Sequence, residues 1–112
     1  MQKKKVEPTF GSIFRAVEEN TKKVSFLQST ATQITLNGNL DNQPLYVKVE
    51  DGKAEVAPYE YINAPFYIDA DAETFASVLN GDKDFVVAVA QGSITINGDA
   101  AQALVFCRTL FG

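Results

Sequence analysis

Histidine is absent from this chain, and cysteine occurs only once, at Cys107. Without histidine, the sequence lacks the commonest general base and the commonest metal ligand. A zinc site would have to rely on oxygen ligands, which is uncommon for zinc. A single cysteine leaves no internal disulfide, which favours a reducing compartment, and we expect a cytoplasmic location.

Long apolar runs are also missing. The longest uncharged apolar run covers residues 85–90, six residues in all, whereas a membrane-spanning helix needs about 20. The lysines at positions 3–5 are not followed by an apolar segment, so we expect no signal peptide. We interpret residues 1–8 as a flexible basic tail and residues 9–112 as a single domain.

Basic residues are scarce in the second half of the chain. Residues 54–112 carry eight acidic side chains against only Lys83 and Arg108, a net charge of −6. Because nucleic-acid binding relies on clustered lysine and arginine, we expect no nucleic-acid partner. The lysines at positions 3–5 favour a solvated tail, with transient contact to a membrane as the alternative.

Two patterns resemble functional sites but favour structural roles. Asp69, Asp71 and Glu73 alternate like the start of a calcium loop, but the glycine and glutamate that complete such a loop are missing. We interpret Asp71 as a helix cap instead. Cys107 stands beside Arg108, which favours thiolate, yet most free cysteines are small core residues. We therefore expect no catalytic residue, no metal site and no cofactor, and the chain is not predicted to be an enzyme.

Hydrophobic periodicity predicts a sequence of helices and strands. Three- and four-residue spacing indicates a first helix from Thr9 to Leu27, with a break near residue 20 as an option. Period-two alternation predicts strands, and capping residues predict two later helices. The strands cover residues 33–37, 45–50, 53–57, 66–70 and 93–97, and the helices cover 71–80 and 99–111. Asp51-Gly52 is the turn of a two-residue hairpin with Gly52 at positive φ.

Residues 84–91 fit two structures. Adjacent valines favour a strand, whereas the length and a capping Asp84 permit a short helix. Strands and helices are otherwise segregated along the chain. This order predicts an α+β fold in which helices cover one face of a mixed sheet.

The last predicted helix is apolar nearly all round. Only Gln102, Arg108 and Thr109 are polar between residues 100 and 111. A surface helix needs an apolar arc of roughly 100°, and this one covers more. The excess surface must face a deeper core, a dimer partner or a bound apolar molecule.

The order of these motifs resembles the sterol carrier protein 2 lipid-binding domain family over residues 10 to 111. The first parts are the strand-and-turn segment 47–53 (VKVEDGK) and the strand that feeds an acidic cap, 64–71 (APFYIDAD). After these the chain carries Phe75, Leu79, Gly81, Gln91-Gly92, ITINGD at 94–99, and Ala103.

The resemblance implies a five-stranded mixed sheet with helices packed on one face, which enclose an apolar cavity. It implies that residues 84–91 are helical. It also implies a non-catalytic carrier domain for a sterol, fatty acid or fatty-acyl ligand. The alternative is a protein-interaction or homodimerisation module that uses the last helix, as an accessory to a separate enzyme.

Six apolar side chains are the predicted ligand contacts in such a cavity. Positions 75 and 79 share one helix face, as do 85 and 89, while 104 and 111 lie seven residues apart on the last helix. The same periodicity describes a plain core equally well. The predicted contacts are Phe75, Leu79, Phe85, Val89, Leu104 and Phe111.

Overall fold

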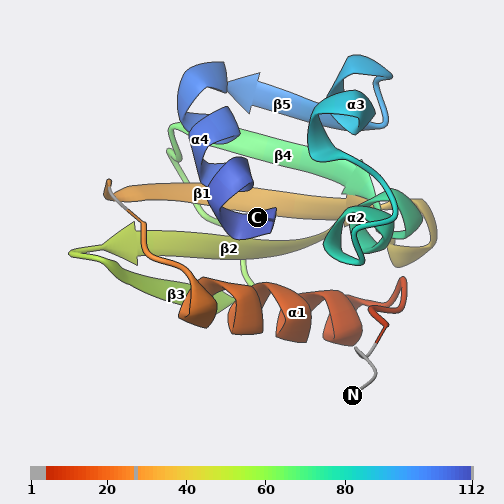
Figure 1. Ribbon diagram of the computed structural model, residues 1–112, viewed down its shortest axis with the longest axis horizontal. Coiled ribbons are helices and arrows are strands. Elements are labelled where there is room, and N and C mark those ends of the chain that lie inside the picture. The colour runs from red at the N-terminus through yellow and green to blue at the C-terminus, as the bar shows by residue number, and fades with distance from the viewer. Residues whose placement is uncertain (1–4, 27, 112) are drawn as a thin grey trace.

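Helices and strands follow one another in the predicted order in the computed structural model, which describes residues 5–26 and 28–111 (Figure 1). Together they confirm the α+β class. The helices are α1 (Phe10–Lys23), α2 (Ala72–Leu79), α3 (Phe85–Ala90) and α4 (Ala100–Phe111), with a 3-10 turn η1 (Gly38–Leu40). The strands are β1 (Thr30–Asn37), β2 (Gln43–Glu50), β3 (Lys53–Ala57), β4 (Phe66–Asp71) and β5 (Ile94–Gly98).

The five strands form one mixed sheet in the order β3-β2-β1-β4-β5. Neighbouring strands are antiparallel except at the centre, where β1 and β4 run parallel with Ile34 opposite Ile68. A parallel pair needs a long crossover connection, and here it contains the β2–β3 hairpin. The mixed sheet predicted from the sequence is confirmed.

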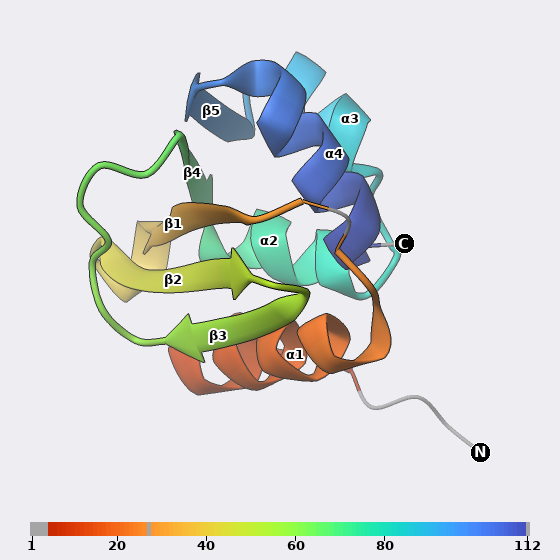
Figure 2. The same ribbon diagram turned by 90° about the vertical axis from the view of Figure 1, so that its left-hand side faces the viewer.

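All four described helices lie on one face of the sheet (Figure 2). Alternate strand residues point toward them and are buried, as the period-two pattern requires, for example Leu45, Val47 and Val49 on β2. Segment 58–65 crosses the opposite face, where the Tyr61 amide donates to Gln33 Oε1 at 3.0 Å. The core therefore lies between the sheet and the helices.

The hairpin between β2 and β3 turns at Asp51-Gly52, as predicted. Asp51 has a φ of 53° and Gly52 a φ of 79°. Two successive positive φ values define the type I′ turn, whose twist matches that of the flanking strands. The predicted hairpin is confirmed.

Helix α1 is shorter than its apolar pattern predicts and has no break. Thr9 caps it by accepting a hydrogen bond from the Ser12 amide at 3.3 Å. Asn20 stays helical, and its Nδ2 donates to the Leu110 carbonyl at 3.3 Å, which offsets its low helix propensity. The helix ends at Lys23, since Val24 is already extended. The predicted end, Leu27, lies outside the described residues.

Residues 84–91 are helical despite their valines. Asp84 caps α3, where its Oδ2 accepts a hydrogen bond from the Val87 amide at 3.1 Å. Phe85 and Ala88 are buried, while Val86 and Val87 face solvent. The helix implied by the family resemblance is confirmed.

The described part of the N-terminal segment is bound to the end of α2. Asn80 Oδ1 accepts from the Val6 amide at 2.7 Å, and Asn80 Nδ2 donates to the Val6 carbonyl at 3.0 Å. Residues 1–4 of the predicted tail lie outside the described residues.

Candidate functional site

Helix α4 divides its apolar side chains between the core and the surface. Ala103, Phe106, Cys107 and Leu110 are buried, whereas Val105 is 58% exposed. A deeper core therefore accounts for much of the apolar excess that the sequence shows. The remaining surface lies on the sides of the helix, next to two pockets.

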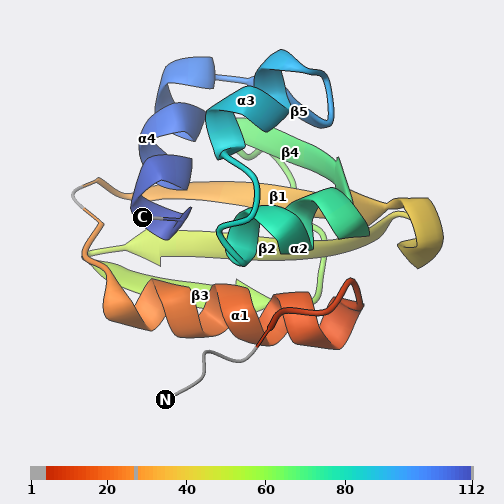
Figure 3. The same ribbon diagram turned by 45° about the vertical axis from the view of Figure 1, so that its right-hand side comes forward.

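Three of the six predicted contacts meet as one aromatic cluster. Phe111, at the end of α4, has its ring centroid 5.5 Å from that of Phe75 on α2 and 5.4 Å from that of Phe85 on α3. Figure 3 shows how the C-terminal end of α4 approaches α2 and the loop that leads to α3. The fold thus joins three helices that the sequence separates.

The other three predicted contacts are aliphatic and differ in burial. Leu79 is buried, and Val89 and Leu104 are partly buried against the core. Leu104 precedes Phe111 by two helical turns, so both lie on one stripe of α4. The assignment of the six residues as ligand contacts stays a prediction.

A pocket of about 450 Å³ opens beside the aromatic cluster. Such a volume lies within the roughly 300–1,000 Å³ of small-molecule sites. The cavity is bounded by the end of α2, the α2–α3 loop, α3 and α4. Its lining consists of Val78, Gly81, Lys83, Asp84, Phe85, Val86, Cys107, Arg108 and Phe111. Two predicted contacts, Phe85 and Phe111, therefore line it.

The charged residues that line this pocket are at its rim, whereas the buried lining residues, such as Phe85 and Cys107, are apolar. Lys83 comes from the α2–α3 loop and Arg108 from α4. In the part of the chain that the structure describes, neither forms an ion pair with a carboxylate. Sequence reasoning missed Lys83, because a single lysine in an acidic stretch carries no signal of where it will lie.

Cys107 also lines the pocket, but it behaves as a core residue. Its side chain is buried, and this burial raises the pKa of the thiol well above its ordinary value. A protonated thiol is a weak nucleophile and a poor metal ligand. The preferred interpretation from the sequence, a small core hydrophobe, is confirmed.

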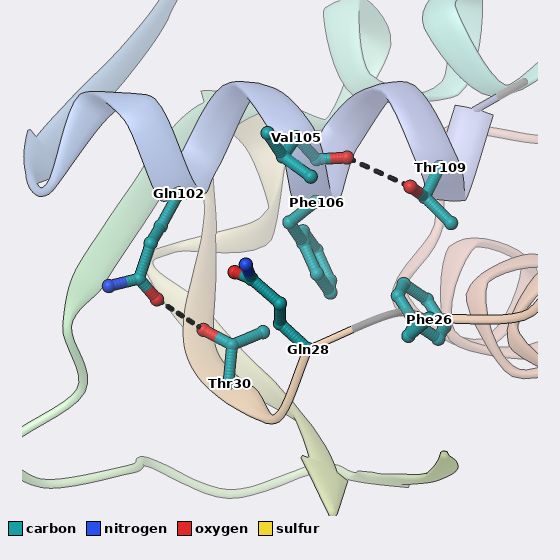
Figure 4. Close-up of a pocket in the computed structure, with 7 residues that line it drawn as sticks. All are labelled: Phe26, Gln28, Thr30, Gln102, Val105, Phe106 and Thr109. Atoms are coloured by element: carbon teal, nitrogen blue, oxygen red, sulfur yellow. Dashed lines mark hydrogen bonds between the residues drawn. The ribbon is translucent and has the colours of Figure 1, made fainter.

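A second, smaller pocket lies on the other side of α4. Figure 4 shows the seven residues that line it: Phe26, Gln28, Thr30, Gln102, Val105, Phe106 and Thr109. Its volume is about 100 Å³, below the roughly 300–1,000 Å³ of small-molecule sites. Hydrogen bonds occupy part of its polar rim, from Thr30 Oγ1 to Gln102 Oε1 at 3.0 Å and from Thr109 Oγ1 to the Val105 carbonyl at 2.9 Å.

Phe106, which lines the small pocket, contacts two further aromatic rings. The Phe106 centroid lies 5.5 Å from Phe26 and 5.6 Å from Phe66 of the sheet. Sequence reasoning did not predict this pocket, because Phe26 was assigned to the first helix, which ends earlier, at Lys23. Of the two pockets beside α4, the one of about 450 Å³ has the larger volume and is therefore the better candidate for a ligand.

Asp71 caps α2, as the sequence predicts. Its Oδ1 accepts from the Thr74 amide and its Oδ2 accepts from Thr74 Oγ1, each at 2.8 Å. Within residues 5–26 and 28–111, no group of three or more potential metal ligands is assembled. Over the same residues, no helix combines the length and apolarity required to cross a bilayer.

Comparison with known proteins relates the fold to one family. The profile of the SCP-2 sterol transfer family matches residues 10–110. Sterol carrier protein 2 like 2 of Aedes aegypti is 15% identical with a TM-score of 0.70, over 85% of this chain and 92% of that chain. Its palmitated form, solved by NMR, is 15% identical with a TM-score of 0.69, over 96% of this chain and 95% of that chain. No curated protein matches the sequence.

An enzyme contains a similar fold as a small part of its length. The inverting sec-alkylsulfatase of Pseudomonas sp. is 12% identical with a TM-score of 0.61. The match covers 88% of this chain but only 14% of the sulfatase chain. At this identity the likeness concerns the fold alone.

Proposed function

Because the chain belongs to the SCP-2 sterol transfer family, we propose that it is a non-catalytic carrier domain that binds an apolar, lipid-like ligand beside α4. The ligand lies in the pocket of about 450 Å³, against the rings of Phe85 and Phe111. Phe75, Leu79, Val89 and Leu104 form the apolar surroundings into which its chain extends. The cytoplasmic location expected from the single cysteine belongs to the same proposal.

The observation that carries this proposal is the aromatic cluster at the edge of an open pocket. Phe111 contacts Phe75 and Phe85 and remains partly exposed. An alkyl chain placed there gains about 0.8 kcal/mol for each methylene removed from water, before ordering costs. Apolar ligands need few polar partners, which fits a protein of this composition.

The structural neighbours give further support. The palmitated form of the Aedes aegypti protein carries a single-chain lipid on the same fold. Lipid transfer needs no chemical step, so we expect it to depend on the shape of the pocket and on the access of the ligand to it.

Binding of Nile red, an uncharged fluorescent probe, tests the proposal. We expect Phe111→Ala to weaken binding by about tenfold, since the probe loses contact with a ring worth about 1.5–3 kcal/mol when buried. Phe14→Ala is the matched control, because Phe14 is a partly buried ring on α1 that does not line the pocket. It should lose similar stability but keep its affinity for the probe.

Two results would contradict the carrier function. The first is a folded wild-type protein that binds neither Nile red nor dodecanol. The second is an equal loss of probe affinity in Phe111→Ala and Phe14→Ala, which would place the site elsewhere.

The interaction module is the second candidate function. It is favoured by Val105, Val86 and Val87, which are 58%, 44% and 46% exposed. Light scattering tests the homodimerisation form of this candidate, which requires a dimer for the wild type and a monomer for Val105→Glu.

A further inference from the structure

The two basic residues of the acidic half lie at the same pocket. Lys83 and Arg108 both line the cavity beside Phe85 and Phe111. All other charged side chains in residues 54–112 are acidic. Within residues 54–112, both positive charges therefore belong to residues that line this pocket.

The backbone around Lys83 is held in place by the end of α2. The Lys83 amide donates to the Ser77 carbonyl at 3.3 Å, and the Gly81 amide donates to the Val78 carbonyl at 3.1 Å. Gly81 adopts a φ of 79°, which allows the chain to reverse directly after the helix. Arg108 projects from the regular backbone of α4. Both cations thus extend from fixed backbone, which lowers the entropic cost of binding.

Negative charge at the pocket does not cancel these cations. Asp84 is the acidic lining residue, and its Oδ2 already accepts the Val87 amide hydrogen bond at 3.1 Å. Cys107 is neutral, because burial raises the pKa of its thiol. Among the described residues, Lys83 and Arg108 have no carboxylate partner, so they are available to an anion from outside.

We propose that Lys83 and Arg108 bind the anionic headgroup of a single-chain lipid whose alkyl chain lies against Phe85 and Phe111. This inference rests on the proposed carrier function. A guanidinium forms two parallel hydrogen bonds to a carboxylate or phosphate, and an ammonium adds a compact charge. The pocket therefore prefers an amphiphile with an anionic end over an uncharged lipid of the same length.

Competition against bound Nile red measures this preference. Dodecanoate, dodecyl phosphate and 1-dodecanol share one chain length and are used below the concentrations at which they form micelles. We expect one or both anions to displace the probe at about tenfold lower concentration than the alcohol. The advantage should shrink in 0.5 M salt, because screening weakens charge interactions at an exposed rim.

Substitution of the two cations identifies the residues responsible. Lys83→Gln and Arg108→Gln should each reduce the affinity for the preferred anion by about 3- to 10-fold, as expected for partly exposed charged hydrogen bonds. Their affinity for dodecanol should not change. Lys53→Gln and Arg15→Gln are the controls, since both side chains are exposed and lie away from the pocket.

The results separate this inference from the carrier function. Equal displacement by the alcohol and both anions overturns the headgroup assignment but leaves the carrier function intact. An anion preference that survives both glutamine variants also overturns it. A wild type that binds neither Nile red nor dodecanol removes the carrier function itself. A preference for one anion alone identifies the headgroup as a carboxylate or a phosphate.

Discussion

Asp99 begins α4 and holds its first turn with both carboxylate oxygens. Oδ1 accepts the Gln102 amide at 3.1 Å, and Oδ2 accepts from Gln102 Nε2 at 2.9 Å. These two hydrogen bonds lower the pKa of Asp99 from its ordinary value of 3.8, and the bond from the Gln102 backbone amide has the larger effect. A lowered folded-state pKa means that the ionised carboxylate stabilises the fold. The sequence predicted a helix that begins at residue 99, because aspartate before an apolar helical pattern is a preferred N-cap.

The pH dependence of stability follows from this shift. Asp99 contributes fully to folding stability above about pH 3.8, the pKa of its carboxyl in the unfolded chain. This contribution is lost as the pH falls through the lower pKa that the carboxyl has in the folded protein. We expect wild type to be more stable than Asp99→Asn at pH 7. The difference should disappear as pH falls from 5 to 2 in urea unfolding experiments. A difference that is constant with pH would show that the charge has no role.

Gly98 permits a close approach between the end of β5 and the start of β4. It has a φ of +109°, and a Cβ there would lie 2.5 Å from the Pro65 carbonyl oxygen and 2.9 Å from Phe66 Cα. The next amide, that of Asp99, donates to the same Pro65 carbonyl at 3.0 Å. This contact fixes where α4 leaves the sheet, and so where the pocket is built.

Gly98→Ala is therefore expected to destabilise the protein by about 2–5 kcal/mol, which combines backbone strain with a clash against backbone atoms. Gly92→Ala is the control, because Gly92 has a φ of +79° but open space around its Cβ position. It should cost only about 1–2 kcal/mol. Chemical denaturation of both variants gives the comparison, and equal losses would argue against the clash.

Most elements were predictable because local signals agreed. The Asp51-Gly52 turn and the Asp71 cap each follow from residue chemistry that few other structures use. The end of α1 was not predictable, since the apolar spacing continues past Lys23. Helix α3 could be predicted only with the family resemblance, because Val86 and Val87 have a high propensity for strands. In the structure both valines are exposed on a short helix that Asp84 caps.

The arrangement of the whole molecule brings together residues that no local pattern connects. Phe75, Phe85 and Phe111 were predicted as a group, but the same spacing fits a plain core. The convergence of Lys83 with Arg108 had no sequence signal, because it depends on how the α2–α3 loop meets α4. The parallel pairing of β1 with β4 likewise depends on tertiary packing.

Substitution by aspartate on either side of α4 tests which face of the helix contacts the ligand. Leu104 is partly buried on the stripe of Phe111, so Leu104→Asp should stay folded with reduced stability and lose uptake of a fluorescent fatty acid. Val105→Asp is the neighbouring control, since Val105 is 58% exposed and lines the smaller pocket. It should retain both fold and uptake, as judged by circular dichroism and fluorescence titration.

Two outcomes would weigh against this assignment. Normal uptake by folded Leu104→Asp removes Leu104 from the site. Loss of uptake in Val105→Asp transfers the site to the small pocket on the other side of the helix.

Parallel pairing of β1 with β4 sets the order in which the sheet can assemble. Strands β1, β2 and β3 are neighbours along the chain and can pair on the microsecond timescale of hairpins. The β1–β4 pair joins Thr32 to Phe66, which are 34 positions apart, so its loop must close first. During synthesis, the edge of β1 remains unpaired until β4 has emerged, and is open to other chains in that interval. The pocket, built from residues after position 77, is the last part of the nascent domain to form.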